Sequence, residues 1–359
     1  MILVINPGSS SLKYKLFDGM ASELILDDDI VINGASIKNH ADASDKMLEK
    51  IGSKLGSITK IGMRVVHGGP KYKEPILVDA DVISEIEKYS QFAPIHNPLS
   101  LEILKLLDEK KLEGVSFFAI FDTGYFHSMP EENYSYSISD IEDDIKIRRY
   151  GFHGISHGYA QDIVDKENQK KVISIHLGAG CSMTAIKCGN VIKTSMGMTP
   201  MEGLIMQTRS GDIDPGLLIY LTEKFGIEEA YELIKKKSGL AGLTKTDGAM
   251  LSVLYAAGEE ISGTDFKPDF QVDDEVRNKS KLALRMYVNR IKEYIGAYSA
   301  LMNGVDVIAF TGKIGYYSPV IREKVVKGLD FLGNVEIAVI KPDEELAMAR
   351  EISKLSVNQ

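Results

Sequence analysis

Residues 5–19 read INPGSSSLKYKLFDG, a pattern typical of a β-hairpin. The apolar run from Ile2 to Ile5 predicts a buried strand, and the alternation from Leu12 to Phe17 predicts a second one. The turn between them is rich in glycine and small hydroxyl residues, which leaves its backbone N–H groups open to an anion such as phosphate. These residues alone fit either an ordinary hairpin or an anion-binding one.

A second copy of the pattern favours the anion-binding interpretation. Residues 172–190 read VISIHLGAGCSMTAIKCGN, again an apolar strand, a glycine-rich turn and an alternating strand. The positions that match at one constant offset are Asn6 with His176, Gly8 with Gly178, and Gly19 with Gly189. A repeat this long is not a solenoid. It predicts two similarly folded domains, each presenting one anion-binding hairpin to a shared cleft.

Length and composition fit an ordinary globular protein of two domains. The chain has 359 residues, of which 44% are hydrophobic and 26% charged. A net charge of −9 argues against nucleic acid as a partner, and no apolar run is long enough to predict a membrane span. Two cysteines fit a reducing compartment, and the N-terminus lacks a signal-peptide pattern. We therefore expect a cytoplasmic protein.

The rest of the chain alternates between strand and helix patterns, which indicates α/β layers. The acidic run Asp27–Asp29 predicts a turn. Strands are expected at 61–66, 115–121 and 305–310, and helices at 43–55, 79–89, 99–107, 158–165, 217–237, 273–303 and 342–352. The two domains should join near 122–125.

Several arginines and histidines fall in glycine-rich loops or at strand ends. They are Arg64, Arg148, Arg149 and Arg209, and His67, His96, His153, His157 and His176. Guanidinium groups in such loops can clamp a carboxylate or a phosphate. A single arginine can equally be a solvated surface residue, and a single histidine a structural one. The spacing gives neither an HExxH nor a CxxC zinc motif.

A carboxylate at a strand end, Asp122, could orient Mg²⁺ beside a transferred phosphate. Asp212 and Asp214 either take part in the chemistry or are turn and helix-cap residues. A third glycine-rich turn, 311–315, is too short for a dinucleotide fingerprint. Phosphoryl transfer depends mainly on positioning and charge neutralisation, so these groups together predict a phosphoryl-transfer cleft.

Seven motifs then occur in one order along nearly the whole chain. They are NPGSSSLK (6–13), RVVHGG (64–69), APIHNP (93–98), FDT (121–123), RRYGFHGISH (148–157), TRSGDIDP (208–215) and FTG (310–312). This series resembles the acetokinase family, a branch of the sugar kinase, Hsp70 and actin superfamily.

The resemblance implies an α/β fold of two ribonuclease H-like (actin-like ATPase) domains, each a mixed five-stranded sheet with helices, around a central cleft. It implies an N-terminal domain of residues 1–122 plus 319–359, to which the C-terminal helix returns. Residues 123–318 would form the second domain and carry the nucleotide site. The family is generally homodimeric, so a homodimer is expected.

The reaction implied by the resemblance is reversible phosphoryl transfer between ATP and acetate or propionate, giving acyl phosphate and ADP with Mg²⁺ (or Mn²⁺). Arg64 and Arg209 would hold the carboxylate and the transferring group, and His153 would donate to the transition state. Asp122 and Asn6 would bind the metal.

The resemblance also implies two binding sets. The acyl pocket would be Val66, Ile95, Phe152 and Pro200. The phosphate and nucleotide residues would be Asn6, Ser9, Ser11, Lys13, His176, Gly178, Gly180, Asp247, Gly312 and Gly315. The family pattern is altered at Ala179, Ala249, Tyr316 and Tyr317. Two alternatives therefore stay open: a donor other than ATP, such as pyrophosphate, or a weakly active or non-catalytic relative with a binding role.

Overall fold

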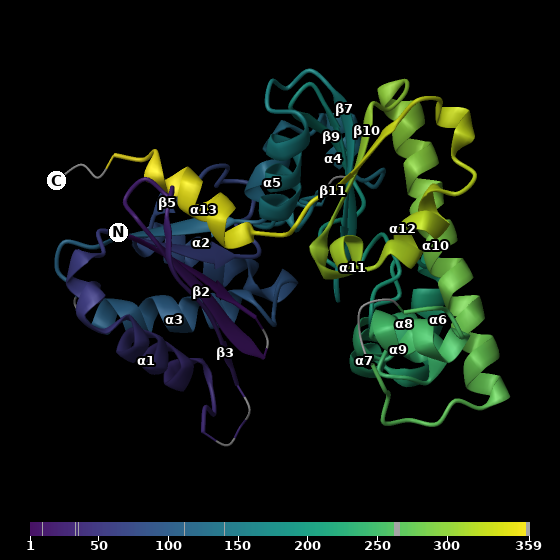
Figure 1. Ribbon diagram of the computed structural model, residues 1–359, viewed down its shortest axis with the longest axis horizontal. Coiled ribbons are helices and arrows are strands. Elements are labelled where there is room, and N and C mark those ends of the chain that lie inside the picture. Colours follow the sequence, from purple (N-terminus) through teal and green to yellow (C-terminus); the bar gives the residue numbers. More distant parts are fainter. Residues whose placement is uncertain are drawn as a thin grey trace.

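The computed structural model describes residues 1–8, 10–32, 34, 36–110, 112–139, 141–261 and 266–356. It contains two mixed sheets with helices around them (Figure 1). The first has the order β3-β2-β1-β4-β6-β5, and the second the order β11-β10-β7-β8-β9. The strands are β1 Ile2–Pro7, β2 Ser11–Phe17, β3 Leu24–Val31, β4 Lys60–Val65, β5 Ile76–Leu77, β6 Ser116–Phe121, β7 Lys171–Leu177, β8 Cys181–Lys187, β9 Asn190–Thr194, β10 Val307–Thr311 and β11 Glu336–Val339.

The two sheets have the same topology, which confirms the repeat seen in the sequence. In each, three antiparallel strands (β1–β3 or β7–β9) are followed by two parallel ones (β4 and β6, or β10 and β11). Each also has a register shift between its second and third strand. The prediction of five strands is wrong for the first sheet, because the short β5 pairs with β6 as a sixth strand.

The helices largely follow the sequence patterns. They are α1 His40–Ile51, α2 Ala80–Tyr89, α3 Asn97–Glu109, α4 Glu131–Tyr134, α5 Gly154–Val164, α6 Pro215–Phe225, α7 Ile227–Lys236, α8 Gly239–Thr244, α9 Met250–Ala257, α10 Asp274–Met302, α11 Gly312–Tyr317, α12 Pro319–Val326 and α13 Glu344–Ser353. Asp273 caps the long α10, because its side chain accepts a hydrogen bond from the Val276 N–H.

Two local expectations were wrong. The single helix expected at 217–237 is two helices, α6 and α7, because Gly226 adopts a positive φ of 83° between them. Asp27–Asp29 lies inside β3 rather than in a turn. Its residues face β2, where Lys13 and Lys15 lie opposite Asp29 and Asp27, so cross-strand charge pairing offsets the low strand propensity of aspartate.

The C-terminal segment contributes to both halves. β11 joins the second sheet beside β10, and α12 stays with that half. The chain then crosses over, and α13 packs on β1, with Met348 and Ile352 buried against Ile2 and Val4 (Figure 1). The division into residues 1–122 plus 319–359 and 123–318 stays a prediction, and this strand pairing favours a return after β11.

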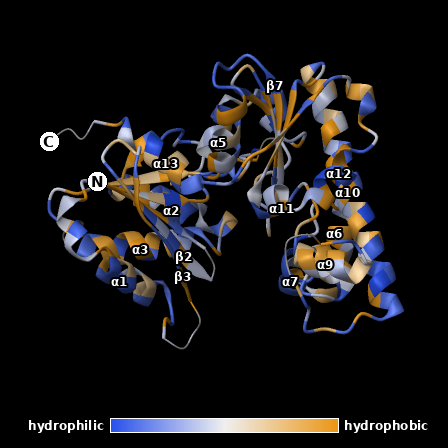
Figure 2. Ribbon diagram, viewed as in Figure 1, coloured by the Kyte–Doolittle hydropathy of each residue, from blue (hydrophilic) through white to orange (hydrophobic). Residues whose placement is uncertain are grey.

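Each sheet is covered by apolar side chains on its helix-facing sides. Figure 2 shows the strands around β7 in the hydrophobic colour, and Val172, Ile173, Ile175 and Leu177 of this strand are fully buried. No helix in the described ranges combines the length and the apolar character needed to cross a membrane. The rigid sheets place the ends of β1, β4, β6 and β7 at the candidate site.

Candidate functional site

Arg64, at the end of β4, forms an ion pair with Asp122, which directly follows the neighbouring parallel strand β6. Its Nη2 lies 2.7 Å from Asp122 Oδ2, and its Nη1 donates to Asn6 Oδ1 at 3.0 Å. Asp122 is fully buried, and burial raises its pKa while the Arg64 charge opposes that rise. Three adjacent strand ends thus bring an arginine, a carboxylate and a carboxamide into one network.

The first turn of α13 adds two carboxylates that sequence reasoning missed. Glu344 Oε2 lies 3.4 Å from Arg64 Nη1, and Asn6 Nδ2 donates to Glu345 Oε1 at 2.8 Å. Burial alone would raise the pKa of Glu344, but Arg64, His176 and Lys13 hold it below its ordinary value. Acidic residues are favoured in the first turn of helices in general, so the sequence gives no sign that Glu344 and Glu345 belong to a site. Their place near Arg64 and Asn6 becomes visible only because α13 packs on β1.

His153 precedes α5 in a left-handed conformation, with φ 58° and ψ 28°. Such a conformation is uncommon for a residue other than glycine and is often found at functional sites. Its neighbour must be glycine, since a Cβ at Gly154 would come within 2.0 Å of the Asp122 carbonyl oxygen. The ring stacks on His176, at the end of β7, with centroids 4.3 Å apart.

A chain of buried hydrogen bonds leads to His153. Ser174 Oγ lies 2.8 Å from His157 Nδ1, His157 Nε2 lies 2.8 Å from Ser182 Oγ, and Ser182 Oγ lies 2.9 Å from His153 Nδ1. In the arrangement that we assign, both rings are neutral, the serine hydroxyls donate to the two Nδ1 atoms, and the proton of each ring resides on Nε2. His153 Nε2–H is then free to donate toward the space beside Gly180.

Arg209 borders the same space and belongs to the same half of the chain as His153 and Gly180. A Cβ at Gly180 would lie 3.1 Å from His153 Nε2 and 3.7 Å from Arg209 Nη1, so both groups border this glycine. Arg209 Nη1 is held by the Pro200 carbonyl oxygen at 2.8 Å. The glycine leaves room for a ligand atom between an imidazole and a guanidinium.

Arg64 and Arg209 act electrostatically on the same histidines. Burial lowers the pKa of His153 well below its ordinary value, and the charges of both arginines lower it further. The pKa of His96 is lowered to about 4, again by burial first and then by the two arginines. Arg64, His153 and Arg209 therefore lie around one region, and burial and both charges favour the neutral form of His153; their roles in a site stay a prediction.

The four expected acyl-pocket residues are only partly brought together. Val66 and Phe152 are buried in one core cluster, and the Pro200 backbone anchors Arg209. Ile95 is 37% exposed. The acyl pocket as a whole stays a prediction.

A cavity of about 620 Å³ opens beside the second hairpin. Its lining includes Gly178 of the turn, Gln207, Ala249 before α9, Tyr287 of α10 and Ile314 of α11. Most of the lining is apolar, with few polar groups, and the volume lies in the usual range for small-molecule sites. It lies next to the turn that borders His153 and Arg209.

The other expected phosphate and nucleotide residues lie around these two regions. Ser11 begins β2, and its carbonyl oxygen accepts the Gly8 N–H at 2.8 Å. Lys13 Nζ lies 3.4 Å from Glu345 Oε2. Asp247 precedes the lining residues Gly248 and Ala249. Ser9 lies outside the described residues.

Gly312 and Gly315 belong to α11, which follows β10 directly. Gly312 has a φ of 76°, and a Cβ there would lie 2.5 Å from the Leu177 carbonyl oxygen, so the close approach of α11 to β7 requires glycine. Gly315 is buried against Phe310. Between them, Lys313 and Ile314 face the cavity.

Other residues singled out in the sequence have structural partners away from this region. Arg149 pairs with Glu202, and the Arg148 guanidinium lies 3.7 Å from the centre of the Tyr134 ring. Asp214 caps α6 through the Leu217 N–H, so the cap interpretation holds for it. Asp212 accepts hydrogen bonds from Arg290 and Tyr294.

The hard oxygen ligands near Arg64 fit Mg²⁺. Asn6, Asp122 and Glu344 bring one carboxamide and two carboxylates into one network. In the part of the chain that the structure describes, no group of three His, Cys, Asp or Glu side chains is arranged to hold a metal alone. Mg²⁺ usually takes one or two carboxylates and completes its shell with water and phosphate, so this set is compatible with it.

Comparison with known proteins gives consistent matches over the full length. The sequence profile of the Acetokinase family matches residues 31–354. The acetate kinase of Bacillus mycoides (strain KBAB4) is 37% identical, over 99% of this chain and 98% of the relative. The acetate kinase of Geobacillus kaustophilus (strain HTA426) is also 37% identical, over 99% of both.

Two solved structures have the same fold. A Porphyromonas gingivalis acetate kinase is 31% identical, covers 97% of both chains and has a TM-score of 0.80. A propionate kinase from Francisella tularensis subsp. tularensis SCHU S4 is 30% identical, covers 98% of both and has a TM-score of 0.84. The chain therefore has the actin-like ATPase fold expected from its motifs.

Proposed function

Because this chain belongs to the acetokinase family, we propose that it is a short-chain carboxylate kinase that transfers a phosphoryl group reversibly between ATP and acetate or propionate. The observation that carries the proposal is the convergence of Arg64, His153 and Arg209 on one region beside the 620 Å³ cavity. Such a region can neutralise a carboxylate and a phosphoryl group at once.

In the proposed reaction, a carboxylate oxygen attacks the γ-phosphorus in line, and the bond to the bridging β–γ oxygen breaks to release ADP. Arg64 and Arg209 neutralise the approaching carboxylate and the equatorial oxygens. His153, held neutral, donates from Nε2 to an equatorial oxygen, while Ser182 fixes its tautomer. No proton has to be removed from the nucleophile, because the carboxylate is already ionised near pH 7.

Asn6 and Asp122, with Glu344 beside them, would hold Mg²⁺ (or Mn²⁺), which would neutralise negative charge on the phosphate groups. The nucleoside would occupy the cavity beside Gly178, between α9 and α11. Its β- and γ-phosphates would extend along the hairpin turns toward Ser11, Lys13 and Gly180. A small apolar pocket at Val66 and Phe152 would take the acyl group, and one methylene changes binding by only about 1–3 kcal/mol, so both acids would be used.

Turnover across a matrix of carboxylates and phosphoryl donors tests this proposal. The hydroxamate assay should detect acyl phosphate from acetate and propionate with ATP and Mg²⁺. Strict dependence on pyrophosphate would instead support the non-ATP donor, the alternative that the altered family positions Ala179 and Ala249 leave open. Binding of ATP without turnover would identify a non-catalytic relative.

We also propose that the chain forms a homodimer through α6 and the start of α7. Among its eleven residues, α6 has none that is buried, although it is strongly apolar. Its exposed apolar side chains, with one from α7, are Leu217, Leu218, Ile219, Tyr220, Phe225 and Ile227. Monomers rarely expose so continuous an apolar surface, so a second copy of the chain is the occupant we assign to it.

A further inference from the structure

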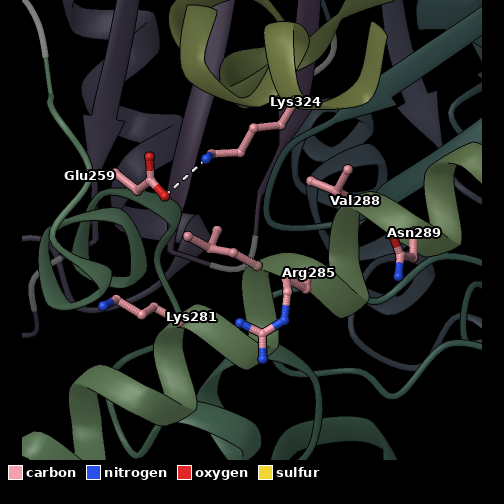
Figure 3. Close-up of a pocket in the computed structure, with 7 residues that line it drawn as sticks. Glu259, Lys281, Arg285, Val288, Asn289 and Lys324 are labelled. Atoms are coloured by element: carbon pink, nitrogen blue, oxygen red, sulfur yellow. Dashed lines mark ion pairs between the residues drawn. The ribbon is translucent and has the colours of Figure 1, made fainter. Parts of the chain in front are cut away.

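A second cavity, of about 380 Å³, lies between α10, α12 and the segment that follows α9 (Figure 3). Lys281 and Arg285 of α10 and Lys324 of α12 bring three positive charges to it, against the single carboxylate of Glu259. The whole chain carries a net charge of −9. The charge of this basic pocket is therefore positive, opposite in sign to the net charge of the chain, and such a pocket attracts small anions.

Two of its cations, Lys281 and Arg285, are exposed on α10 and have no partner among the described residues. Lys324 Nζ pairs with Glu259 Oε1 at 2.9 Å, and Figure 3 shows these side chains pointing toward each other. No hydrogen bond or ion pair within the described ranges engages Lys281 or Arg285. They lie four residues apart on one helix, a spacing at which like charges repel. An anion bound between them would relieve this repulsion.

The basic pocket suits an organic anion better than a bare ion. Leu284 and Val288 are buried and give it an apolar floor, and the Asn289 carboxamide adds a donor and an acceptor at its edge. Its volume lies within the range of small-molecule sites and exceeds what one phosphate group fills.

The basic pocket and the candidate nucleotide cavity share their walls. Glu259 lines the former, and Glu260 and Ile261 line the latter. Along α12, Val320 faces the nucleotide cavity and Lys324 the basic pocket, one turn apart. On α10, Tyr287 faces the cavity and its neighbour Val288 the pocket. Glu259 thus directly precedes a residue of the cavity wall along the chain, and Lys324 lies one helical turn from another.

We propose that the basic pocket is a regulatory site for a small phosphorylated metabolite, which binds Lys281, Arg285 and Lys324 and displaces Glu259 from Lys324. The displacement loosens the segment at 259–261 and weakens nucleotide binding. The regulatory part rests on the proposed function, whereas the binding part does not.

Calorimetric titration of the full chain with pyrophosphate at low ionic strength tests the binding part. Arg285→Ala should weaken pyrophosphate binding at this site by about fivefold or more, and Glu259→Gln should strengthen it, because a competing carboxylate is removed. The matched control is Arg277→Ala, about two turns earlier on the exposed face of α10 and outside the basic pocket. If pyrophosphate binds only at the phosphoryl-transfer region, Arg285→Ala and Arg277→Ala will bind it with the same affinity. That result overturns the proposal.

Titration with ADP tests the coupling. Glu259→Gln should weaken ADP binding by about fivefold, because it breaks the same pair that the metabolite would break. Glu323→Gln, an exposed glutamate on α12 outside both cavities, should leave it unchanged. Equal ADP affinity in wild type and Glu259→Gln overturns the regulatory part. Absence of ADP binding in the wild type would overturn the proposed function and the coupling, while the pyrophosphate comparison would still decide the binding part.

Discussion

His153 and His176 stack with their ring centroids 4.3 Å apart and their planes 16° apart. His153 precedes α5, and His176 lies near the end of β7, so the stack joins the start of a helix to the central strand of the second sheet. Burial lowers the pKa of both rings, and for His153 the neighbouring His176 lowers it further. Burial and the neighbouring ring both favour the neutral form of His153, which can donate from Nε2 in the tautomer assigned above.

Buried neutral histidines make stability depend on pH. The pKa of His67 is lowered to about 3, and those of His153 and His157 well below the ordinary value, in each case by burial first. The unfolded chain takes up these protons near pH 6.5, but the folded chain does not. Stability is therefore complete above pH 6.5 and falls as pH decreases below it, by about 1.4 kcal/mol per pH unit for each such histidine.

Urea unfolding followed by circular dichroism at pH 8, 7 and 5 measures this effect. We expect nearly equal midpoints at pH 8 and 7, and a clearly lower one at pH 5. A midpoint that stays constant between pH 7 and pH 5 would show that these histidines accept protons in the folded chain.

Replacing Ser182 by alanine should disturb the tautomer of His153. The change removes the hydroxyl between His157 Nε2 and His153 Nδ1, so either ring nitrogen of His153 can then carry the proton. We expect kcat to fall about tenfold, less than on loss of an oxyanion donor itself, with KM little changed. An unpaired buried His157 N–H should also cost about 1–3 kcal/mol of stability.

Ser299→Ala is the matched control, because Ser299 is also buried but bonds only to its own helix, through the Ile295 carbonyl oxygen. If both variants keep wild-type kcat and the same pH profile, Ser182 does not position His153.

Glu344→Gln should raise the Mg²⁺ concentration that gives half-maximal activity by about tenfold, since loss of one ligating carboxylate weakens a site with few protein ligands. Glu351→Gln, two turns later on α13, is the control for any effect on the helix. Activity is measured against free Mg²⁺ at saturating nucleotide. An unchanged Mg²⁺ dependence in Glu344→Gln would remove this residue from the metal site.

Ile219→Glu should convert a dimer to a monomer, because it places a charge in the middle of the exposed apolar face of α6. Leu301→Glu, at an exposed leucine on α10, should leave the mass unchanged. Light scattering after size exclusion reads the mass directly. A wild-type chain that elutes as a monomer at all concentrations would contradict the proposed dimer.

The hairpin pattern was enough to predict the two like sheets, because turn glycines and alternating strands depend on local sequence. The offset between Gly8 and Gly178 recurs as equivalent turns between β1 and β2 and between β7 and β8. Helix breaks and strand partners were less visible. The positive φ of Gly226 divides one periodic pattern into two helices, and the lysines of β2 make a strand of Asp27–Asp29.

The site was predictable where residues lie in their own glycine-rich loops, as with Arg64, His153 and Arg209. Glu344 was not predictable in this way. Its place beside Asn6 depends on a contact across more than 300 residues, made when α13 packs on β1. The two acidic residues at the start of that helix carry no local signal that separates a ligand from a helix-stabilising charge.

The account depends on the idea that two guanidinium groups and one imidazole act on one migrating phosphoryl group. The most direct test is the initial rate of acyl hydroxamate formation from acetate, ATP and Mg²⁺ by wild type and Arg209→Ala. We predict measurable turnover by wild type and at least about 100-fold slower turnover by Arg209→Ala, the usual effect of removing a transition-state donor. Turnover of Arg209→Ala within about twofold of wild type would contradict this central claim.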